Sequence, residues 1–446
     1  MIEELKQLLG EENIYDAQPH RQLYGVAGQL PELVLFPSNN EQVSTVLKLA
    51  NRAHKKVMVC GKNSQRYFGA TIEPFDWCIA LNRMTQIIEH AAADLTVTVE
   101  AGIQLSQLQS FLNQQRQFLP IDPFDASLRT VGGIVATNST GPLRLLYGAI
   151  RDLVLGMTII LADGTLIRAG GKTVKNVAGY DLSKMFVGSM GTLGVITSIT
   201  FRLFPLPAYS QTLWVEFDQF DSIANLLRQL AASNLVIGRC EFLNARFVKL
   251  FKLDWIRCQT PQGLLINVHG PIEMVVLTMR RLQQLAHSFE GKNFETWQGK
   301  EDAQLWDQIA SRSSAQSKQG FSSHFQVALP KSSTIPMIEA VKQFGNEQGI
   351  NFGIDAQVGN GMIHIFNDEQ NGSRLRSQIE SLRQMALDYQ GNLVVVSLMN
   401  HSDFPIGIEP DLIWGSPRPD FRLMKLIKAK YDPAGIFAAG RFIGGL

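Results

Sequence analysis

Four glycines in one short stretch of the chain could bring bare backbone against a ligand. Gly179, Gly188, Gly191 and Gly194 precede a β-branched run at residues 195–200. A backbone without side chains can approach a ligand closely. In a dinucleotide-binding fingerprint the strand comes first, the glycines follow and a helix comes last, and here that order is reversed. The stretch predicts a close-contact ligand site that is not a Rossmann NAD site.

A second glycine-rich stretch lies upstream. It comprises residues 119–123, 130–141 and 147–152, and includes the run Thr130-Val-Gly-Gly133. Segments 36–43, 61–69, 99–102 and 431–442 complete the pattern. In their types and order these pieces resemble the flavin domain of the vanillyl-alcohol-oxidase (PCMH-type) flavoproteins. The resemblance covers about residues 30–207 and the C-terminal tail, and it implies a bound FAD.

An FAD site needs backbone amides for the pyrophosphate and a dry slot for the ring. The resemblance places these residues at the cofactor: Gly61, Lys62, Asn63, Ser64, Pro120, Thr130, Gly132, Gly133, Ala136, Thr137, Gly141, Gly191, Gly194, Ile196 and Arg441. Asn63 stands where relatives have glycine, and asparagine tolerates a left-handed backbone. Two alanines precede Gly440-Arg441 where relatives have Asn-Pro. The residues alone are also compatible with ordinary glycine-rich turns and a loop-to-strand corner.

The mode of FAD attachment follows from the same resemblance. Some members hold the flavin covalently through a histidine in the phosphate loop or a cysteine in the second glycine-rich segment. Residues 57–70 contain no histidine and residues 119–152 contain no cysteine. We therefore expect noncovalent FAD.

Substrate-binding residues are predicted in the second half of the chain. Related D-2-hydroxyacid dehydrogenases gather a divalent metal with a motif that begins and ends in histidine. This chain keeps His364 but has Gln357 in place of the first histidine, and one imidazole is a poor site for a catalytic metal. We expect no metal, and His364, Arg312 and His324 as the candidate catalytic residues. The alternatives are an ordinary strand histidine at 364 and an exposed helix-end charge at 312.

Composition excludes several function classes. The 41 basic and 40 acidic residues leave a net charge of +1, which creates no global field for nucleic acid. The 4 cysteines show no metal or disulfide spacing, so we expect reduced thiols and no iron–sulfur cluster within the chain. An acidic amphipathic N-terminus and short apolar runs predict no signal peptide and no membrane span. The expected location is the cytoplasm, with any membrane association made through partners.

The element pattern predicts an α+β protein. Residues 1–207 form a two-lobed PCMH-type FAD-binding domain with an N-terminal helix, and the boundary lies at Phe204-Pro-Leu-Pro207 because proline ends strands. Residues 208–410 alternate apolar strands with helical patterns, which favours an antiparallel-sheet cap domain with helices on one face. Residues 411–446 are expected to return to the FAD domain as a tail.

The pattern as a whole, including residues 411–417 and the last seven residues, is most similar to the E-subunit family of bacterial and cyanobacterial glycolate oxidases (glycolate dehydrogenases). This resemblance implies a small hydroxyacid substrate such as glycolate, a second flavoprotein subunit and an iron–sulfur subunit that receives electrons. Two alternatives remain open. One is a stand-alone FAD dehydrogenase for another small hydroxyacid or alcohol, and the other is a non-catalytic scaffold.

Overall fold

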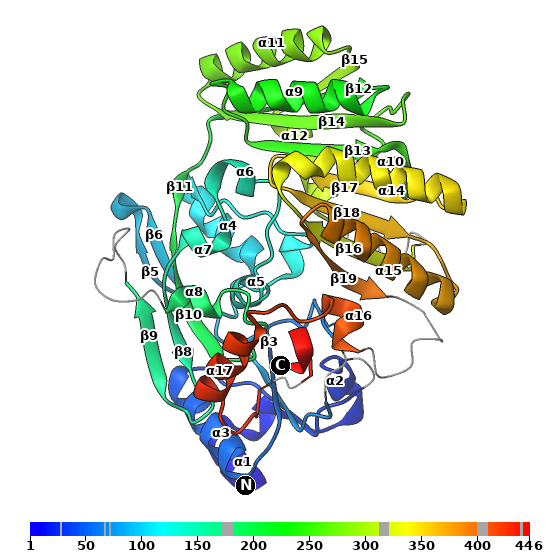
Figure 1. Ribbon diagram of the computed structural model, residues 1–446. Helices are drawn as coiled ribbons and strands as arrows, with labels where there is room; N and C mark the ends of the chain where they lie inside the picture. The colour runs from blue at the N-terminus through cyan, green and yellow to red at the C-terminus, as the bar shows by residue number, and fades with distance from the viewer. Residues whose placement is uncertain are drawn as a thin grey trace.

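The computed structural model describes residues 1–26, 29–66, 68–70, 73–171, 182–311, 321–398, 409–437 and 440–446. Two sheet-based bodies are stacked one on the other, with the N-terminus at the far end of the first body (Figure 1). We call the first the N-terminal domain and the second the cap domain. The chain passes from one to the other between Arg202, where β10 ends, and Tyr209, where β12 begins.

The N-terminal domain contains two sheets. The first has the strand order β1-β2-β4-β3, in which β2, β4 and β3 are parallel; the second, β5-β6-β10-β8-β9, is antiparallel throughout. Their strands are β1 Ile14–Tyr15, β2 Leu33–Leu35, β3 Val57–Cys60, β4 Trp77–Ala80, β5 Ile87–Ala91, β6 Thr96–Glu100, β8 Val154–Ile160, β9 Leu166–Gly170 and β10 Val195–Arg202. Strands β8 and β9 form an antiparallel hairpin that turns through Asp163-Gly164.

Helices connect and cover these two sheets. They are α1 Ile2–Leu9, α2 Gln18–Gln22, α3 Asn40–Arg52, α4 Leu105–Gln114, α5 Val131–Thr137, α6 Arg144–Tyr147, α7 Ile150–Leu153 and α8 Ser183–Phe186, with 3-10 turns at Glu11–Asn13, Ala92–Asp94 and Ala126–Leu128. Helix α3 begins after Asn39, whose side chain accepts a hydrogen bond from the Gln42 amide, as an N-cap should. Its apolar stripe, Val43, Val46 and Leu47, enters one core shared by both sheets.

The cap domain is built on one antiparallel sheet with the order β15-β12-β14-β13-β17-β18-β16-β19. Its strands are β12 Tyr209–Phe217, β13 Arg239–Asn244, β14 Gln262–Gly270, β15 Lys292–Gln298, β16 Ser323–Ala328, β17 Gly353–Gln357, β18 Met362–Asn367 and β19 Asn392–Leu398. Two further short strands, β7 Gln117–Phe118 and β11 Phe204–Pro205, pair with each other beside the linker. The sequence pattern did not reveal β13 and β15; β15 is a polar strand at the sheet edge with little buried surface.

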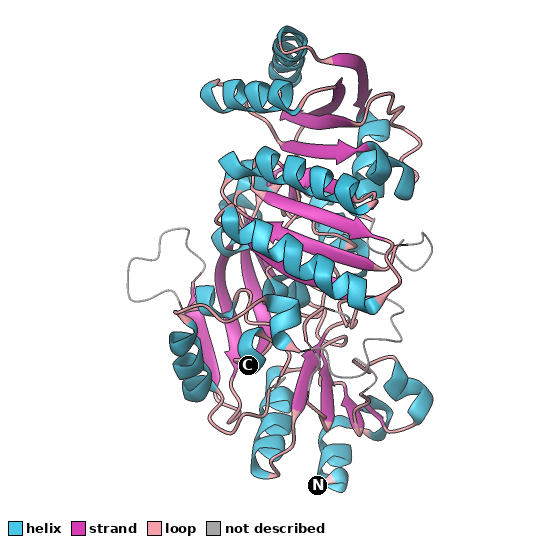
Figure 2. Ribbon diagram, turned by 45° about the vertical axis from the view of Figure 1, so that its right-hand side comes forward, coloured by secondary structure: helices cyan, strands magenta, loops and turns pink. Residues whose placement is uncertain are grey.

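Four long helices cover one face of the cap sheet, as the strand and helix pattern predicts. They are α9 Phe220–Ala232, α11 Ile272–Ser288, α14 Thr334–Gln348 and α15 Gly372–Asp388, and they share one hydrophobic core with the strands. Figure 2 shows helices stacked across this face. The opposite face carries the shorter helices α10 Ala245–Leu250 and α12 Gly299–Ala310 over a separate core. Helices therefore lie on both faces, with the longer ones on one side.

The last segment contacts both domains. Helix α16 Pro410–Trp414 packs on the cap core, whereas α17 Phe421–Tyr431 packs on the N-terminal domain, and a 3-10 turn at Ile443–Gly445 ends the chain. Beyond α17 the chain runs beside β3, where the Val57 amide donates to the Ile436 carbonyl at 2.6 Å. None of the described helices is both long and apolar enough to cross a membrane.

Candidate functional site

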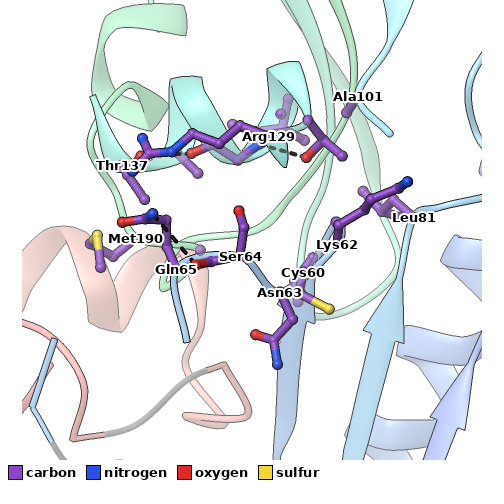
Figure 3. A pocket seen from close by; sticks show the side chains of 18 of the residues that line it. Cys60, Lys62, Asn63, Ser64, Gln65, Leu81, Ala101, Arg129, Thr137 and Met190 are labelled. Carbon is purple, nitrogen blue, oxygen red and sulfur yellow. Dashed lines mark hydrogen bonds between the residues drawn. The ribbon is translucent and has the colours of Figure 1, made fainter. Parts of the chain in front are cut away.

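One pocket in the N-terminal domain gathers three longer chain segments, residues 58–65, 129–137 and 190–196, together with three single residues from elsewhere in the chain. It encloses about 960 Å³ free of protein atoms, part of it open to solvent. Its lining comprises Met58, Val59, Cys60, Gly61, Lys62, Asn63, Ser64, Gln65, Leu81, Ala101, Arg129, Thr130, Gly132, Gly133, Ala136, Thr137, Met190, Gly191, Gly194, Ile196 and Arg441. We call it the α5 pocket, because α5 and the loop after β3 lie on opposite sides of it (Figure 3).

The loop after β3 lines this pocket and has unused backbone donors. Within the described part of the chain, none of the amides of residues 61–65 has a hydrogen-bond acceptor. Asn63 has φ 54°, in the left-handed region that asparagine tolerates, and its side chain donates to the Leu23 carbonyl at 3.1 Å. Successive free amides in such a turn form a concavity that binds anions.

Helix α5 forms the opposite wall. The Thr130 hydroxyl caps its first turn by accepting from the Gly133 amide, and Asn138 ends it with φ 49°. The Gly132 amide donates to the Ala101 carbonyl at 2.8 Å, so the helix begins directly against the end of β6. This placement keeps Thr137 and the small residues of α5 along the cavity.

The pocket glycines serve two different purposes. A Cβ on Gly61 would lie 2.2 Å from Thr130 Oγ1, and one on Gly194 would lie 2.9 Å from Ile159 Cγ2, so these two permit close packing within the protein. A Cβ on Gly191 would have nothing within 4 Å, and one on Gly133 would meet only Thr130 Oγ1, at 3.2 Å. Gly133 and Gly191 therefore leave empty space that a ligand can fill.

Arg441 is a buried residue whose side chain links the C-terminal tail to the pocket loop by hydrogen bonds. Its Nη2 donates to the carbonyls of Gln65 at 3.0 Å and Phe68 at 2.8 Å, and its Nε also reaches Phe68. Desolvation lowers the pKa of Arg441 to about 10, so it remains charged at neutral pH. A Cβ on Gly69, which has φ +104°, would lie 2.9 Å from the Arg441 side chain, so the position of Arg441 leaves no room for a larger residue here. Ala438 and Ala439 lie outside the described residues.

Arg129 is the one charged residue among the pocket-lining residues that the sequence pattern missed. It is 7% exposed, and in the described part of the chain its Nε and Nη1 have no hydrogen-bond partner. Desolvation lowers its pKa to about 10, against a smaller opposing effect of the Asp125 carboxylate. It immediately precedes Thr130, so its position next to the glycine-rich segment was the one available signal.

Most of the expected cofactor residues line the α5 pocket, but two do not. Pro120 and Gly141 lie outside its lining. A Cβ on Gly141 would lie 1.9 Å from the Asp122 carbonyl oxygen, so this glycine allows two segments of the same domain to meet. Gly179 lies outside the described residues.

The candidate catalytic histidines meet in the cap domain. His324 on β16 and His364 on β18 are 1% and 2% exposed, and their Nε2 and Nδ1 atoms are hydrogen-bonded at 3.0 Å. The centroid of the Phe124 ring, which belongs to the N-terminal domain, lies 4.6 Å from that of the His364 ring. Neither histidine belongs to the α5 pocket lining. Arg312 lies outside the described residues.

Buried carboxylates accompany this pair on the sheet face that looks toward the N-terminal domain. Asp355 is opposite His364 in the ladder, and Glu241 is opposite Gln357. The side chains of Asp355, Glu241 and Gln357 are 0 to 1% exposed. We call His324, His364, Asp355, Glu241 and Gln357 the histidine face. Among the described residues, no three histidine, cysteine, aspartate or glutamate side chains are grouped so as to hold a metal ion.

A second polar contact joins the two domains. The Tyr147 hydroxyl and His269 Nε2 lie 2.8 Å apart, and His269 Nδ1 lies 2.8 Å from Asn267 Oδ1. Desolvation raises the pKa of Tyr147 to about 12 and lowers that of His269 to about 4. The neutral phenol therefore donates to His269. Nearby, Arg239 donates to Asp122 across the same boundary at 3.0 Å.

Comparison with known proteins assigns both domains. Residues 31–170 match the FAD binding domain family, and residues 206–394 match the C-terminal domain of FAD linked oxidases. The chain is an FAD-dependent oxidoreductase. FAD is its cofactor, and its fold is the PCMH-type FAD-binding fold with an antiparallel cap sheet.

Curated relatives extend over nearly the whole chain. The glycolate oxidase subunit GlcD of Bacillus subtilis is 26% identical, covering 98% of this chain and 96% of the relative. The probable mitochondrial D-lactate dehydrogenase of Danio rerio is 27% identical and covers 93% of this chain and 84% of the relative. Among solved structures, p-cresol methylhydroxylase with bound substrate has a TM-score of 0.76 at 16% identity and covers 99% of this chain and 95% of that one. That likeness concerns the fold.

The α5 pocket fits FAD on observations of its own. The free amides of residues 61–65 suit a diphosphate, and the unpartnered nitrogens of Arg129 suit an anion. The open space beside Gly133 and Gly191 admits a chain of ligand atoms. Donors, charge and space thus coincide in one cavity.

Proposed function

We propose that the α5 pocket holds FAD without a covalent bond. The observation that supports this is the coincidence of unbonded amides on one wall with empty Cβ positions on the other. The amides of Gly61, Lys62, Asn63 and Ser64 bind the diphosphate, and Gly133 and Gly191 leave room for the rest of the cofactor. Pro120 and Gly141 act behind this wall, by shaping the second glycine-rich segment.

The substrate is a small 2-hydroxyacid such as glycolate, bound between the α5 pocket and the histidine face. Bound FAD supplies the acceptor for the hydride that leaves the substrate carbon. In a hydrogen bond between two imidazole nitrogens, one nitrogen must carry no proton so that it can accept the bond. At least one of His324 and His364 is therefore neutral. A neutral imidazole can accept the substrate hydroxyl proton. Arg312 is proposed to bind the substrate carboxylate.

The chain works as the E-type FAD subunit of a multisubunit glycolate dehydrogenase. The similarity to a subunit of glycolate oxidase supports an assembly. Gln357 stands where metal-using relatives have a histidine, and the described residues contain no metal-binding cluster. The 4 cysteines form no group that could hold an iron–sulfur cluster. Electrons therefore leave through a second flavoprotein and an iron–sulfur subunit, in the cytoplasm or at a membrane through those partners.

A second candidate is a stand-alone dehydrogenase for D-lactate or another 2-hydroxyacid. It is favoured by the D-lactate dehydrogenase of Danio rerio, which aligns with 93% of this chain. In this case the chain's own histidine face would carry out the complete reaction with its substrate, and the reduced flavin would be reoxidised by a separate acceptor.

One experiment separates the two candidates. The purified chain is precipitated with acid, and all yellow colour should pass into the supernatant as free FAD. The native chain is then mixed anaerobically with millimolar glycolate or D-lactate in a stopped-flow spectrometer. The subunit proposal expects the flavin to stay oxidised until the partner chains are co-expressed. Rapid reduction of the isolated chain supports the stand-alone enzyme, and a colourless chain contradicts both.

A further inference from the structure

Arg129 carries a positive charge that its own domain does not neutralise. The side chain is 7% exposed, and its Nε and Nη1 have no hydrogen-bond partner among the residues that the structure describes. Asp125 is the one carboxylate that acts on it, and no ion pair joins these two described residues. Burial lowers the arginine pKa to about 10, so the guanidinium is still protonated at neutral pH. A buried, charged group without partners is unfavourable unless a ligand compensates it.

The position of Arg129 indicates where that ligand lies. Figure 3 shows its side chain reaching along α5 toward Thr137, across the cavity from Ser64 and Gln65. The loop that carries these two residues presents the amides of residues 61–65, which have no acceptor in the described chain. Two kinds of anion-binding donor, backbone amides and a guanidinium, therefore line one pocket from opposite walls.

We propose that Arg129 binds the diphosphate of FAD and is the counter-cation that completes the α5 pocket. This inference rests on the proposed placement of FAD in that pocket. The loop amides hold one side of the diphosphate and the planar guanidinium donates to the other, which excludes water from the phosphate oxygens. Without FAD, the buried charge of Arg129 is not compensated. With FAD bound, the diphosphate supplies the opposite charge.

The alternative partner for this charge is the flavin ring, which becomes anionic when reduced. The two partners differ in a measurable way. ADP contains the diphosphate but no flavin, so a phosphate-binding arginine affects ADP affinity. A ring-binding arginine shifts the reduction potential of bound FAD and leaves ADP affinity unchanged.

The test uses the full chain with FAD removed and compares wild type with Arg129→Met, Arg129→Gln and Arg129→Lys. Calorimetric titration with ADP and with FAD should show about 10- to 100-fold weaker binding for the Met and Gln variants. The Lys variant keeps the charge and should recover part of that affinity. Thermal unfolding of the apoprotein should be unchanged or raised in the Met variant, because an uncompensated charge has been removed.

Each other result overturns the inference. Wild-type ADP and FAD affinity in the Met and Gln variants contradicts it, and so does an altered reduction potential with unchanged ADP affinity. A Met variant that fails to fold even with saturating FAD shows that Arg129 serves the fold instead. Failure of the proposed FAD placement is recognised separately: a Gly133→Val variant would then keep its FAD.

Discussion

The α5 pocket and the histidine face gather opposite kinds of chemical group. The pocket is lined largely by backbone, glycine and small side chains, with Arg129 and Arg441 as its buried charges. The histidine face consists of two imidazoles, two carboxylates and one amide, all buried on strands of the cap sheet. Backbone donors suit a large cofactor that stays bound, whereas imidazoles and carboxylates suit proton transfer to a small substrate. Binding and chemistry are therefore expected to be separable by mutation.

The largest expected effect is loss of FAD on filling the pocket. Gly133→Val adds a side chain into the space beside α5, where a Cβ meets only Thr130 Oγ1, so FAD content should fall to near zero in a folded chain. Gly171→Val is the matched control, since its Cβ also has open space but lies outside the pocket lining. Flavin absorbance per chain and circular dichroism measure both quantities. Normal FAD content in Gly133→Val would show that the cofactor does not bind in the α5 pocket.

The next effect should appear at the histidine face and leave FAD binding intact. His364→Ala in the co-expressed assembly should lower the rate of anaerobic flavin reduction by glycolate about 100-fold, because the proton acceptor is lost. The same protein should retain its full FAD content. His287→Ala, at the exposed end of α11, is the control. If the two regions were not separable, His364→Ala would release FAD as well.

The contact between the domains should respond to pH through His269. Its folded-state pKa is about 4, below the ordinary 6.5, so the unfolded chain binds a proton first as pH falls. The contribution of this group to the free energy of unfolding is complete above pH 6.5 and decreases as the pH falls to about 4. At pH 5 the loss amounts to about 2 kcal/mol. In urea unfolding at pH 7.5 and pH 5, His269→Gln should show a correspondingly smaller loss. An equal loss in both proteins would contradict the low pKa.

The smallest expected effect concerns the hydrogen bond at the same contact. Tyr147→Phe removes the phenol that donates to His269 and keeps the stacked rings, so unfolding free energy should fall by about 1 kcal/mol. FAD content and flavin reduction rate should stay at wild-type values. Urea unfolding, flavin absorbance and stopped-flow reduction provide the three readings. A large drop in reduction rate would show that this contact also sets the distance between the α5 pocket and the histidine face.

The element pattern could be predicted where a local signal was strong. Alternating and helical apolar spacing indicated most strands and helices, because burial of one face depends on residues close in sequence. The polar edge strand β15 was missed because it buries little surface and so lacks that spacing. Helices on the second face of the cap sheet were not expected either, because the packing of α10 and α12 there depends on a separate core assembled from distant segments.

The sequence by itself determined the order of the glycine-rich segments, the FAD-binding family they resemble, and the absence of the usual residues for covalent attachment. These are properties of residue type and spacing. Only the tertiary structure decided which glycines face the cavity and which face protein, that two nitrogens of the buried Arg129 find no partner among the described residues, and that His324 meets His364. Such relations join residues far apart in the chain. They depend on burial and on the direction of each side chain, which exist only once the sheets and helices have packed.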